Sequence, residues 1–417
     1  MSFFEWDFSA PKSSPLGDRE VAPKGEHLSG KKVALIVSGG IAAMKAPLLA
    51  RALRKEGALV TAFLSEEGKR YVGADALAWS TQNDVVTHLS HKAEHLSDET
   101  RFDAYLVAPA TYNIINKMAN GSADSPCSTV LASALGRMEK KETNIIICPT
   151  MHGSMHNSVL VESCKKLKEK GVHFLKPRDD YGKHNIPEEE VIVAFVCRSL
   201  STSTLKKKKI LVTGGPTPVA IDGIRRLTNH FTGALGGMVA QELTLRGADP
   251  FLINGAGKYT PPYWVHHKTI SSFEEYRDLI QKTLSEENYW AGIFSSSVAD
   301  YAPKETREGK MPSGKKKLVI DLRPTEKVIE KVRTSFKDLL MVTFKYEENI
   351  SKENLLKKAS LRLKDYSLVI ANRREDFEEF GEQVAWFLTF GGQVERVQGK
   401  EAIAKAIVDR LESFVKI

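Results

Sequence analysis

The sequence predicts an α/β protein with two domains and mainly parallel sheets. Short apolar runs alternate with helical patterns in both halves of the chain, which is typical of strands joined by crossover helices. A strand, a glycine-containing turn and an amphipathic helix follow one another twice, from residue 33 and again from residue 210. The chain of 417 residues exceeds one ordinary core, since domains usually hold roughly 100 to 200 residues.

The expected domain boundaries follow from shifts in composition. The first thirty residues contain Glu5, Asp7, Pro11 and Pro15 and have no apolar stretch of the kind found in signal peptides. A basic run, Lys206 to Lys209, precedes the second strand-turn-helix pattern. We therefore expect a disordered tail over 1–29, a first domain over 30–201, a solvated basic linker over 202–209 and a second domain over 210–417.

Composition excludes several classes of protein. The 42% hydrophobic and 27% charged content is that of a globular protein, and no apolar run is long enough to span a bilayer. The net charge is +8, but the basic residues are scattered and no nucleic-acid-binding motif accompanies them, so anionic small ligands explain the charge better than nucleic acid or a membrane. The four cysteines form no CxxC pair, which favours a cytoplasmic protein with buried, reduced thiols.

In the first half, polar motifs follow the predicted strands. Apolar runs at 33–37, 59–64, 105–108 and 145–148 are the expected strands, and 41–56 has helical periodicity. Ligands of parallel sheets bind beyond the carboxyl ends of the strands. The segments found there are Ser38-Gly39-Gly40-Ile41, Ser65, Pro109-Ala110-Thr111-Tyr112-Asn113 and Pro149 to His156.

The motifs SGGIAAMK (38–45), PATYN (109–113) and PTMHGSMH (149–156) resemble the phosphopantothenoylcysteine decarboxylases, which are flavoproteins. The resemblance implies a Rossmann-like fold that binds FMN, with His95 as the catalytic base. It also implies that Met151 and His152 hold the substrate carboxylate, since an imidazole can replace the family's asparagine as a donor. The implied FMN contacts are Ser38, Gly39, Gly40, Ile41, Ser65, Pro109, Ala110, Thr111, Asn113, Ser128 and Thr129.

The sequence departs from this family at one functional segment. The family carries a flexible clamp whose cysteine helps to return the electrons of the flavin to the product, and Arg178 stands at that place here. An alternative therefore stays open, in which the first domain is a non-catalytic flavin-binding scaffold and the second alone is active.

Histidine spacing permits other interpretations. His88, His91 and His95 are spaced to share one helical face, as a solvated stripe or as metal ligands. His152 and His156 lie four residues apart but lack the glutamate of a zinc-protease motif. We predict no protein-bound metal centre.

The second half repeats the α/β pattern. Strands are expected at 210–212, 251–253, 292–294, 339–344 and 368–370, and helices at 238–246, 273–284 and 401–415. Gly214, Gly215 and Pro216 form a turn after the first of these strands. Gly233 and Gly236 precede a helix, whose free N–H groups suit a phosphate.

This half resembles the phosphopantothenate-cysteine ligases. The matching motifs are Gly215-Pro216-Thr217, then Asp222, Arg225, Asn229, Thr232 and Gly233, then Val298 to Tyr301, and Phe344 to Glu347. Lys310 follows Asp300 at the spacing of the family's loop lysine. The resemblance implies nucleotide contacts by Gly215, Pro216, Thr217, Thr232, Gly233, Val298, Ala299, Asp300, Phe344 and Lys345.

Ligase chemistry requires these residue types. Activation of a carboxylate by a nucleoside triphosphate brings anionic groups together, so Lys310 and Mg²⁺ would offset their repulsion. Asn229 would donate to the acyl oxygen, and Arg225 would pair with the phosphate of the substrate. The residue types do not decide between CTP, which we favour, and ATP.

Both halves in this order resemble the bifunctional enzymes of coenzyme A biosynthesis. The resemblance implies ligation of 4'-phosphopantothenate with cysteine, then FMN-dependent decarboxylation of phosphopantothenoylcysteine, in a homo-oligomer of unknown size. A nicotinamide dehydrogenase would require GxGxxG with an acidic residue about twenty positions on, and no such run exists.

Overall fold

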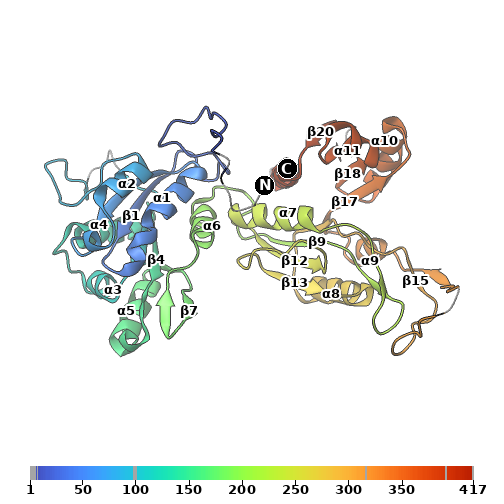
Figure 1. Ribbon diagram of the computed structural model, residues 1–417, viewed down its shortest axis with the longest axis horizontal. Helices are drawn as coiled ribbons and strands as arrows, with labels where there is room; N and C mark the ends of the chain where they lie inside the picture. Colours follow the sequence, from blue (N-terminus) through green and yellow to red (C-terminus); the bar gives the residue numbers. More distant parts are fainter. Residues whose placement is uncertain (1–5, 7, 97–100, 315–316, 390–391, 416–417) are drawn as a thin grey trace. The chain divides into compact units, whose positions relative to one another are not determined.

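The chain folds into two α/β units, Met1–Leu200 and Ser201–Ile417. The computed structural model describes residues 6, 8–96, 101–314, 317–389 and 392–415 (Figure 1). Each unit has a largely parallel sheet with helices on both faces, so the predicted fold class is confirmed. Within the described residues, every helix is too short or too polar to cross a bilayer.

The first unit contains a five-stranded parallel sheet in the order β2-β1-β3-β4-β6. Its strands are β1 (Lys32–Val37), β2 (Leu59–Leu64), β3 (Ala104–Ala110), β4 (Asn144–Pro149) and β6 (His173–Phe174). The chain adds β2 on one side of β1 and β3 on the other, so the strand order reverses between β1 and β3. In open α/β sheets this switch point is where ligands bind.

Alternate strand residues point to opposite sides of this sheet, so apolar side chains occupy both faces. Helices cover both faces and bury these side chains. Ile36, Val107 and Ile147 pack in one buried cluster with Ile115 and Leu131. Burial of each such side chain stabilises the fold by about 1.5–3 kcal/mol. The helices are α1 (Ala46–Lys55), α2 (Ala74–Thr81), α3 (Tyr112–Asn120), α4 (Pro126–Glu139), α5 (Ser158–Glu169) and α6 (Glu189–Leu200), with short 3₁₀ turns η1 (Ile41–Lys45), η2 (Gly68–Arg70) and η3 (Gly153–Met155).

The cysteines belong to the core of this unit. Cys127, Cys148 and Cys197 are buried, and Cys164 is partly buried. Burial raises the pKa of Cys127 to about 12 and raises the pKa of Cys148 as well. The expectation of buried thiols is therefore confirmed for Cys127, Cys148 and Cys197.

A small antiparallel sheet in the order β5-β8-β7 follows β4. Its strands are β5 (Met151–His152), β7 (Arg178–Asp180) and β8 (Lys183–Asn185). Tyr181 and Gly182, both with positive φ, connect β7 to β8. The segment where the resemblance predicts a flexible clamp is thus a hairpin paired with the 149–156 motif.

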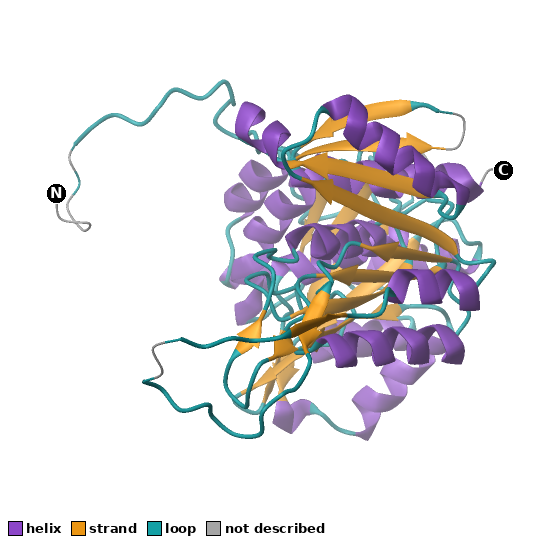
Figure 2. Cartoon of the chain, turned by 90° about the vertical axis from the view of Figure 1, so that its right-hand side faces the viewer, coloured by secondary structure: helices purple, strands orange, loops and turns teal. Residues whose placement is uncertain are grey.

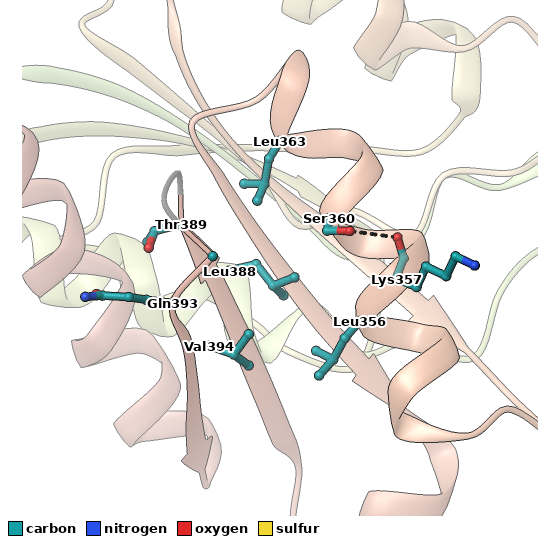
Figure 3. Close-up of a pocket in the computed structure, with 9 residues that line it drawn as sticks. Leu356, Lys357, Ser360, Leu363, Leu388, Thr389, Gln393 and Val394 are labelled. Atoms are coloured by element: carbon teal, nitrogen blue, oxygen red, sulfur yellow. Dashed lines mark hydrogen bonds between the residues drawn. The ribbon is translucent and has the colours of Figure 1, made fainter.

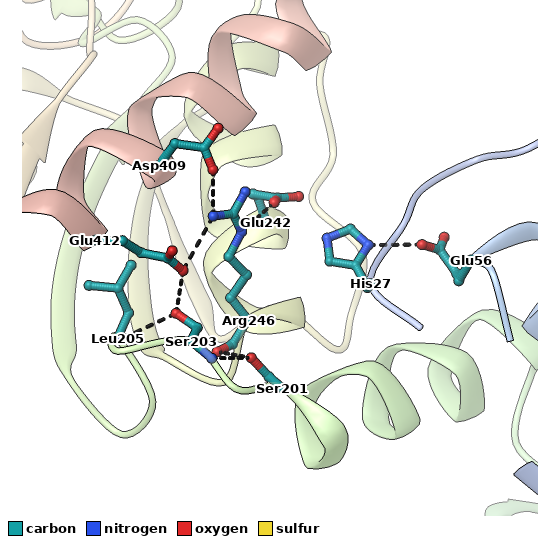
Figure 4. A network of polar contacts seen from close by, with 9 residues as sticks. All are labelled: His27, Glu56, Ser201, Ser203, Leu205, Glu242, Arg246, Asp409 and Glu412. Atoms are coloured by element: carbon teal, nitrogen blue, oxygen red, sulfur yellow. Dashed lines mark hydrogen bonds and ion pairs between the residues drawn. The ribbon is translucent and has the colours of Figure 1, made fainter. Parts of the chain in front are cut away.

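The prediction of a disordered tail over 1–29 is wrong for residues 24–28. The N–H groups of Lys24 and Gly25 donate to the carbonyl of Lys55, and Leu28 is fully buried. His27 Nδ1 lies 2.8 Å from Glu56 Oε2 (Figure 4). Residues 24–28 are therefore fixed to the first unit, while residues 1–5 and 7 lie outside the described part of the chain.

The second unit contains an eight-stranded sheet in the order β13-β12-β9-β14-β17-β18-β19-β20. Pairing is parallel from β13 to β18 and antiparallel from β18 to β20. The strands are β9 (Lys209–Gly214), β12 (Asp249–Gly255), β13 (His267–Ile270), β14 (Ala291–Phe294), β17 (Leu340–Glu347), β18 (Leu368–Arg373), β19 (Val384–Thr389) and β20 (Val394–Gln398). The switch point of this sheet lies between β9 and β14.

Helices again cover both faces of the sheet (Figure 2). The helices are α7 (Ala234–Leu245), α8 (Phe273–Glu286), α9 (Val328–Ser335), α10 (Lys352–Ser360), α11 (Arg374–Phe380) and α12 (Lys400–Val415), with η4 (Leu361–Lys364). Residues of α7 and α12 share one core cluster, and residues of α8, α9 and α10 share the other. Arg246 joins α7 to α12, with Nη1 2.6 Å from Asp409 (Figure 4).

The predicted linker, 202–209, is packed and not simply solvated. Leu205 is fully buried in the core that contains α7 and α12. Ser203 Oγ donates to Glu412 at 2.5 Å, and Lys209 already belongs to β9 (Figure 4). The basic run is therefore the exposed side of a turn that belongs to the second unit.

Two short hairpins extend from this sheet. They are β10 (Val219–Ala220) with β11 (Arg226–Leu227), and β15 (Tyr301–Pro303) with β16 (Leu322–Pro324). The β15–β16 connection carries Lys310 and extends from the body of the unit (Figures 1 and 2).

Candidate functional site

In the second unit, the turn after β9 lies against the loop after β14. Pro216 and Ser297 form a backbone bridge, and Ser297 N–H donates to Gly215 O at 3.0 Å. Thr217 Oγ1 accepts the N–H of Ala299 at 2.9 Å. Because these loops leave neighbouring strands at the switch point, they form one side of the expected ligand crevice.

Two glycines permit the close approach of backbone in this crevice. Gly215 has φ +77°, and a Cβ there would lie 2.7 Å from Gly255 O. Gly233 has φ +88° at the start of α7, and a Cβ there would lie 3.0 Å from Gly215 Cα. A larger residue would close the space in front of α7, whose first N–H groups suit an anion.

Asn229 and the loop that follows it connect two of the predicted motifs. Asn229 Nδ2 donates to Ser297 Oγ at 2.7 Å. The Phe231 ring lies edge-on to the Tyr346 ring, with centroids 5.5 Å apart. The 229–233 loop therefore contacts both the exit of β14 and the carboxyl end of β17.

Asp222 fixes the loop that carries Lys310. Its Oδ1 accepts the N–H of Arg225 at 2.6 Å, and its Oδ2 accepts the N–H of Met311 at 3.0 Å. Gly223 N–H donates to Gly309 O at 2.8 Å, so both neighbours of Lys310 are held. The Arg225 N–H, followed by that of Met311, holds the pKa of this carboxyl well below its usual range.

Arg225 itself is already paired. Its Nη1 donates to Asp222 Oδ2 at 2.6 Å, and its side chain is 41% exposed. The exposed part of the guanidinium retains donors for a phosphate, because the group has five N–H bonds.

The charged nucleotide-site candidates form ion pairs. Asp300 Oδ1 lies 2.5 Å from Lys327 Nζ, and Lys345 Nζ lies 2.8 Å from Glu347 Oε1. The hydrogen bond from Lys345 lowers the pKa of Glu347. Both candidate side chains are therefore paired with an opposite charge within the second unit.

In the first unit, Ser38 joins the two loops of the switch point. Its Oγ donates to Pro109 O at 2.7 Å and lies 3.2 Å from Thr111 Oγ1. Ser38 is 3% exposed, so this bond satisfies a buried carbonyl. The predicted flavin motifs after β1 and β3 are thus in direct contact.

The other predicted flavin residues have varied surroundings. Ser65 Oγ accepts the N–H of Gly68 at 3.0 Å, which places it in the turn beside β1. Asn113 is exposed in the first turn of α3. Thr129 Oγ1 donates to Ala123 O at 3.2 Å. Ser128 is buried, and its side chain closes the capping box of α4, so its hydroxyl has a structural role.

His95 lies in a loop, so the prediction of a shared helical face for His88, His91 and His95 is wrong. The described residues around them form turns. Ser90 Oγ donates to Glu94 at 2.5 Å, and such local bonds compete with helix formation. Burial acts to raise the pKa of Glu94, but the Ser90 bonds lower it to about 2. His95 Nδ1 is buried and has no partner among the described residues.

The predicted carboxylate-binding residues lie on β5. Met151 is buried and pairs with His184 of β8, while His152 is exposed. His152 Nδ1 accepts the N–H of Ser154 at 3.1 Å. Arg178, at the place of the family cysteine, pairs with Glu188 at 2.5 Å.

Comparison with known proteins gives matches over nearly the whole chain. The coenzyme A biosynthesis bifunctional protein CoaBC of Thermococcus kodakarensis is 34% identical over 403 residues, which cover 94% of this chain and 98% of that protein. The chain belongs to the CoaBC family. The CoaBC protein of Methanocaldococcus jannaschii is 29% identical over 398 residues, covering 94% of this chain and 96% of that protein.

Two family models match the chain, one in each half. The flavoprotein family matches residues 21–201, and the DNA/pantothenate metabolism flavoprotein C-terminal domain matches residues 205–414. A crystal structure of the C-terminal domain of a CoaBC protein aligns with 52% of this chain and 99% of that one, at 23% identity and a TM-score of 0.43.

The structure adds residues that sequence reasoning did not assign in this CoaBC chain. Asp222 belongs to a ligase motif, but the sequence assigned it no role of its own. An Asx-turn pattern is the local signal that could have indicated its role in the loop. The contact of Phe231 with Tyr346, and that of His184 with His156, join residues far apart in sequence. No local pattern predicts such pairs.

A cavity of about 250 Å³ lies away from these candidate residues. It lies between α10 and the β19–β20 connection, and Leu356, Leu363 and Leu388 line it (Figure 3). None of the predicted site residues lines this cavity, so it does not mark the nucleotide crevice.

Proposed function

We propose that the second unit joins 4'-phosphopantothenate to cysteine through an acyl-nucleotide, and that the first unit decarboxylates phosphopantothenoylcysteine with FMN. One observation carries the ligase assignment: the motif loops meet around the β9–β14 switch point. Thr217 contacts Ala299, Asn229 contacts Ser297, and Asp222 contacts Met311. The family of the chain supports both activities.

For the ligase, the proposed roles follow from the charge that develops. The α7 N-terminus and Lys310 stabilise the triphosphate, with Mg²⁺ bound mainly by the phosphates. Asn229 donates to the acyl oxygen, and Arg225 binds the substrate phosphate. The cysteine amine then attacks the acyl-nucleotide, a step that depends mainly on orientation. We favour CTP over ATP.

For the decarboxylase, the groups at the β1–β3 switch point suit FMN. The turn after Ser38 and the start of α3 offer N–H groups to a phosphate. His95 Nδ1 is a buried polar atom without a partner among the described residues, which is consistent with a ligand in its neighbourhood. When bound, the flavin supplies the hydride acceptor. His95 acts as the base, and Met151 and His152 position the carboxylate.

The scaffold alternative for the first unit is not favoured. The relatives that match both units are named bifunctional, and their alignments cover 94% of this chain. We further propose that the protein acts in the cytoplasm as a homo-oligomer, on small-molecule substrates.

The test is to supply purified protein with phosphopantothenate, cysteine, Mg²⁺ and either CTP or ATP, and to measure pyrophosphate. We expect release that requires a nucleotide and that continues beyond a single turnover only with cysteine, faster with CTP. A separate incubation of phosphopantothenoylcysteine with the FMN-loaded protein should release carbon dioxide. Absence of pyrophosphate with either nucleotide would overturn the ligase assignment, and absence of carbon dioxide from protein that binds FMN would overturn the decarboxylase.

A further inference from the structure

Three titratable side chains form a line of hydrogen bonds across the small sheet of the first unit. His156 Nδ1 lies 3.0 Å from His184 Nε2, and His184 Nδ1 lies 2.6 Å from Asp179 Oδ1. The two imidazole rings are tilted, with centroids 5.1 Å apart. His184 thus stands in the middle and uses both of its ring nitrogens.

The sheet fixes this line from two sides. His184 pairs across the ladder with Met151 of β5 and with Asp179 of β7. Directly opposed residues of an antiparallel pair bring their side chains together on one face. His156 follows β5 by a single 3₁₀ turn, Gly153–Met155, so its place relative to His184 is set by the same strand.

The donor and acceptor atoms of these three side chains define where protons can lie. Ionised Asp179 accepts the Nδ1–H of His184. One proton is then shared between His184 Nε2 and His156 Nδ1, and a further proton makes His156 Nε2 a donor. Loss of that proton from Nε2 leaves two neutral rings, and because His156 is exposed, its Nε2 regains a proton from solvent. The arrangement orients the His156 ring with Nε2 as its free proton donor, and we call the line of Asp179, His184 and His156 the relay.

The geometry is unsuited to a metal ion. A metal site needs ligand atoms that converge on one point, whereas His184 lies between its partners with one nitrogen toward each. Within the described ranges, the His, Cys, Asp and Glu side chains whose ligand atoms do converge are His27, Glu56 and Cys197. The line at His184 is instead a chain of pairwise hydrogen bonds, which can orient a proton donor.

We propose that His156, supported by His184 and Asp179, delivers the proton to the carbon that loses carbon dioxide; this role rests on the proposed decarboxylase. His156 belongs to the same 149–156 segment as the proposed carboxylate-binding residues Met151 and His152. A proton donor on that segment would lie beside the carbon that carries the carboxylate.

The step balances in atoms and electrons. The bond between this carbon and the carboxylate breaks, carbon dioxide leaves, and the electron pair forms the C=C bond of an enethiolate. The His156 Nε2–H bond then breaks, and the C=C pair forms the new C–H bond. A bound reduced flavin would supply the hydride for the sulfur-bearing carbon, so that the product would form as a thiolate. His156 Nε2 regains its proton from solvent.

Other groups of the unit suit this role less well. Burial raises the pKa of the Cys127 thiol to about 12 and raises that of Cys164. A thiol of the core is shielded from substrate. His152 Nδ1 accepts a backbone N–H, which favours its use as a fixed contact.

The test compares His156→Gln and the nearly isosteric Asp179→Asn with His173→Gln, a histidine on edge strand β6 outside the relay. In a single turnover of FMN-loaded protein with phosphopantothenoylcysteine, we expect normal flavin reduction and carbon dioxide release in all three. Formation of the 4'-phosphopantetheine product should slow about 100-fold in His156→Gln and about tenfold in Asp179→Asn.

A second readout does not depend on turnover. Imidazole ¹⁵N and proton spectra of the purified protein should show a strongly hydrogen-bonded His184 Nδ1–H, whose signal shifts to that of a weaker bond in Asp179→Asn and stays unchanged in His173→Gln. If wild type turns over and both relay variants form product at the wild-type rate, or if Asp179→Asn leaves the His184 signals unchanged, the inference is overturned. If wild type releases no carbon dioxide, it is the proposed decarboxylase that fails.

Discussion

The two units have the same kind of switch point in their sheets but differ in the loops that surround it. In each, the strand order reverses beside the first strand, and a hydroxyl joins the two loops that leave this point. In the first unit Ser38 Oγ donates to Pro109 O, whereas in the second Thr217 Oγ1 accepts the N–H of Ala299. The opposite direction of these bonds leaves different groups available to a ligand.

The loops around these hydroxyls differ more between the two units than the hydroxyl bonds do. The second unit adds the Asp222 loop, the 229–233 loop and the long Lys310 connection around its crevice. The first unit adds one hairpin, which pairs with the 149–156 segment. The comparison teaches that a shared sheet topology positions a phosphate-binding turn, while the chemistry comes from loops added at its rim.

The largest expected effect is that of Lys310 on the ligase alone. Lys310→Ala removes a cation from the developing pyrophosphate charge, so we expect pyrophosphate formation to fall about 100- to 1,000-fold. Carbon dioxide release by the first unit should not change. Lys317→Ala, an exposed lysine of the same connection, serves as the matched control. Equal losses in both variants would mean that general loop charge, and not Lys310, assists the reaction.

A smaller loss is expected for Asn229→Ala, about 100-fold, because the acyl oxygen loses one donor. If the second step suffers more than the first, acyl-nucleotide should accumulate and be detectable after acid quench. Thr228→Ala, at the neighbouring exposed position, should keep wild-type rates. Loss of nucleotide binding in Asn229→Ala, in place of intermediate accumulation, would assign Asn229 to the nucleotide and not to the acyl group.

The sequence predicts the central parallel strands of both units, because they are largely buried and appear as continuous apolar runs. The bounds of β1 are predicted within one residue and those of β9 within two. The parallel edge strands β6 and β13 are missed, because both are short and partly exposed. The antiparallel strands β19 and β20 are missed. β20 is mostly exposed and carries charged residues, and its pairing with β19 depends on partners that no local pattern reveals.

The residues of the candidate sites also include some that the sequence predicts and some that it does not. Residues at strand ends, such as Ser38 and Thr217, can be predicted because topology places those ends together. The helical face of His88, His91 and His95 fails because the Ser90 and Glu94 side chains stabilise a turn. Asp222 and His184 act through contacts with distant segments, and their roles appear only in three dimensions.

Paired variants sharpen the comparison of the two hydroxyls. Ser38→Ala leaves Pro109 O without its bond, and Thr217→Val removes the acceptor of the Ala299 N–H. Each loss corresponds to about 1–3 kcal/mol, so we expect about 5- to 150-fold weaker binding of the local ligand. Flavin affinity should fall only in Ser38→Ala, and the KM for nucleotide should rise only in Thr217→Val. Effects of either variant on both ligands would contradict independent sites.

The smallest expected effect concerns the pH dependence of the Lys310 loop. Because the folded-state pKa of Asp222 is depressed, its stabilising contribution is fully present above its ordinary value of about 3.8 and is lost only as pH falls through the lower folded value. Hydrogen exchange at the Met311 amide, corrected for intrinsic rates, should therefore show constant protection between about pH 8 and 5.

Substitution at Asp222 distinguishes the effect of this carboxylate from a general effect of low pH on the protein. Asp222→Asn removes a charged acceptor, so protection at Met311 should fall about tenfold at every pH in that range. Glu305→Gln, an exposed carboxylate on the same connection, should leave the protection unchanged. Protection that already declines between pH 7 and 5 in wild type would show that a histidine or a weaker carboxyl holds the loop. In that case, the rim of the second crevice would be less firmly attached than the hydrogen bonds of Asp222 indicate.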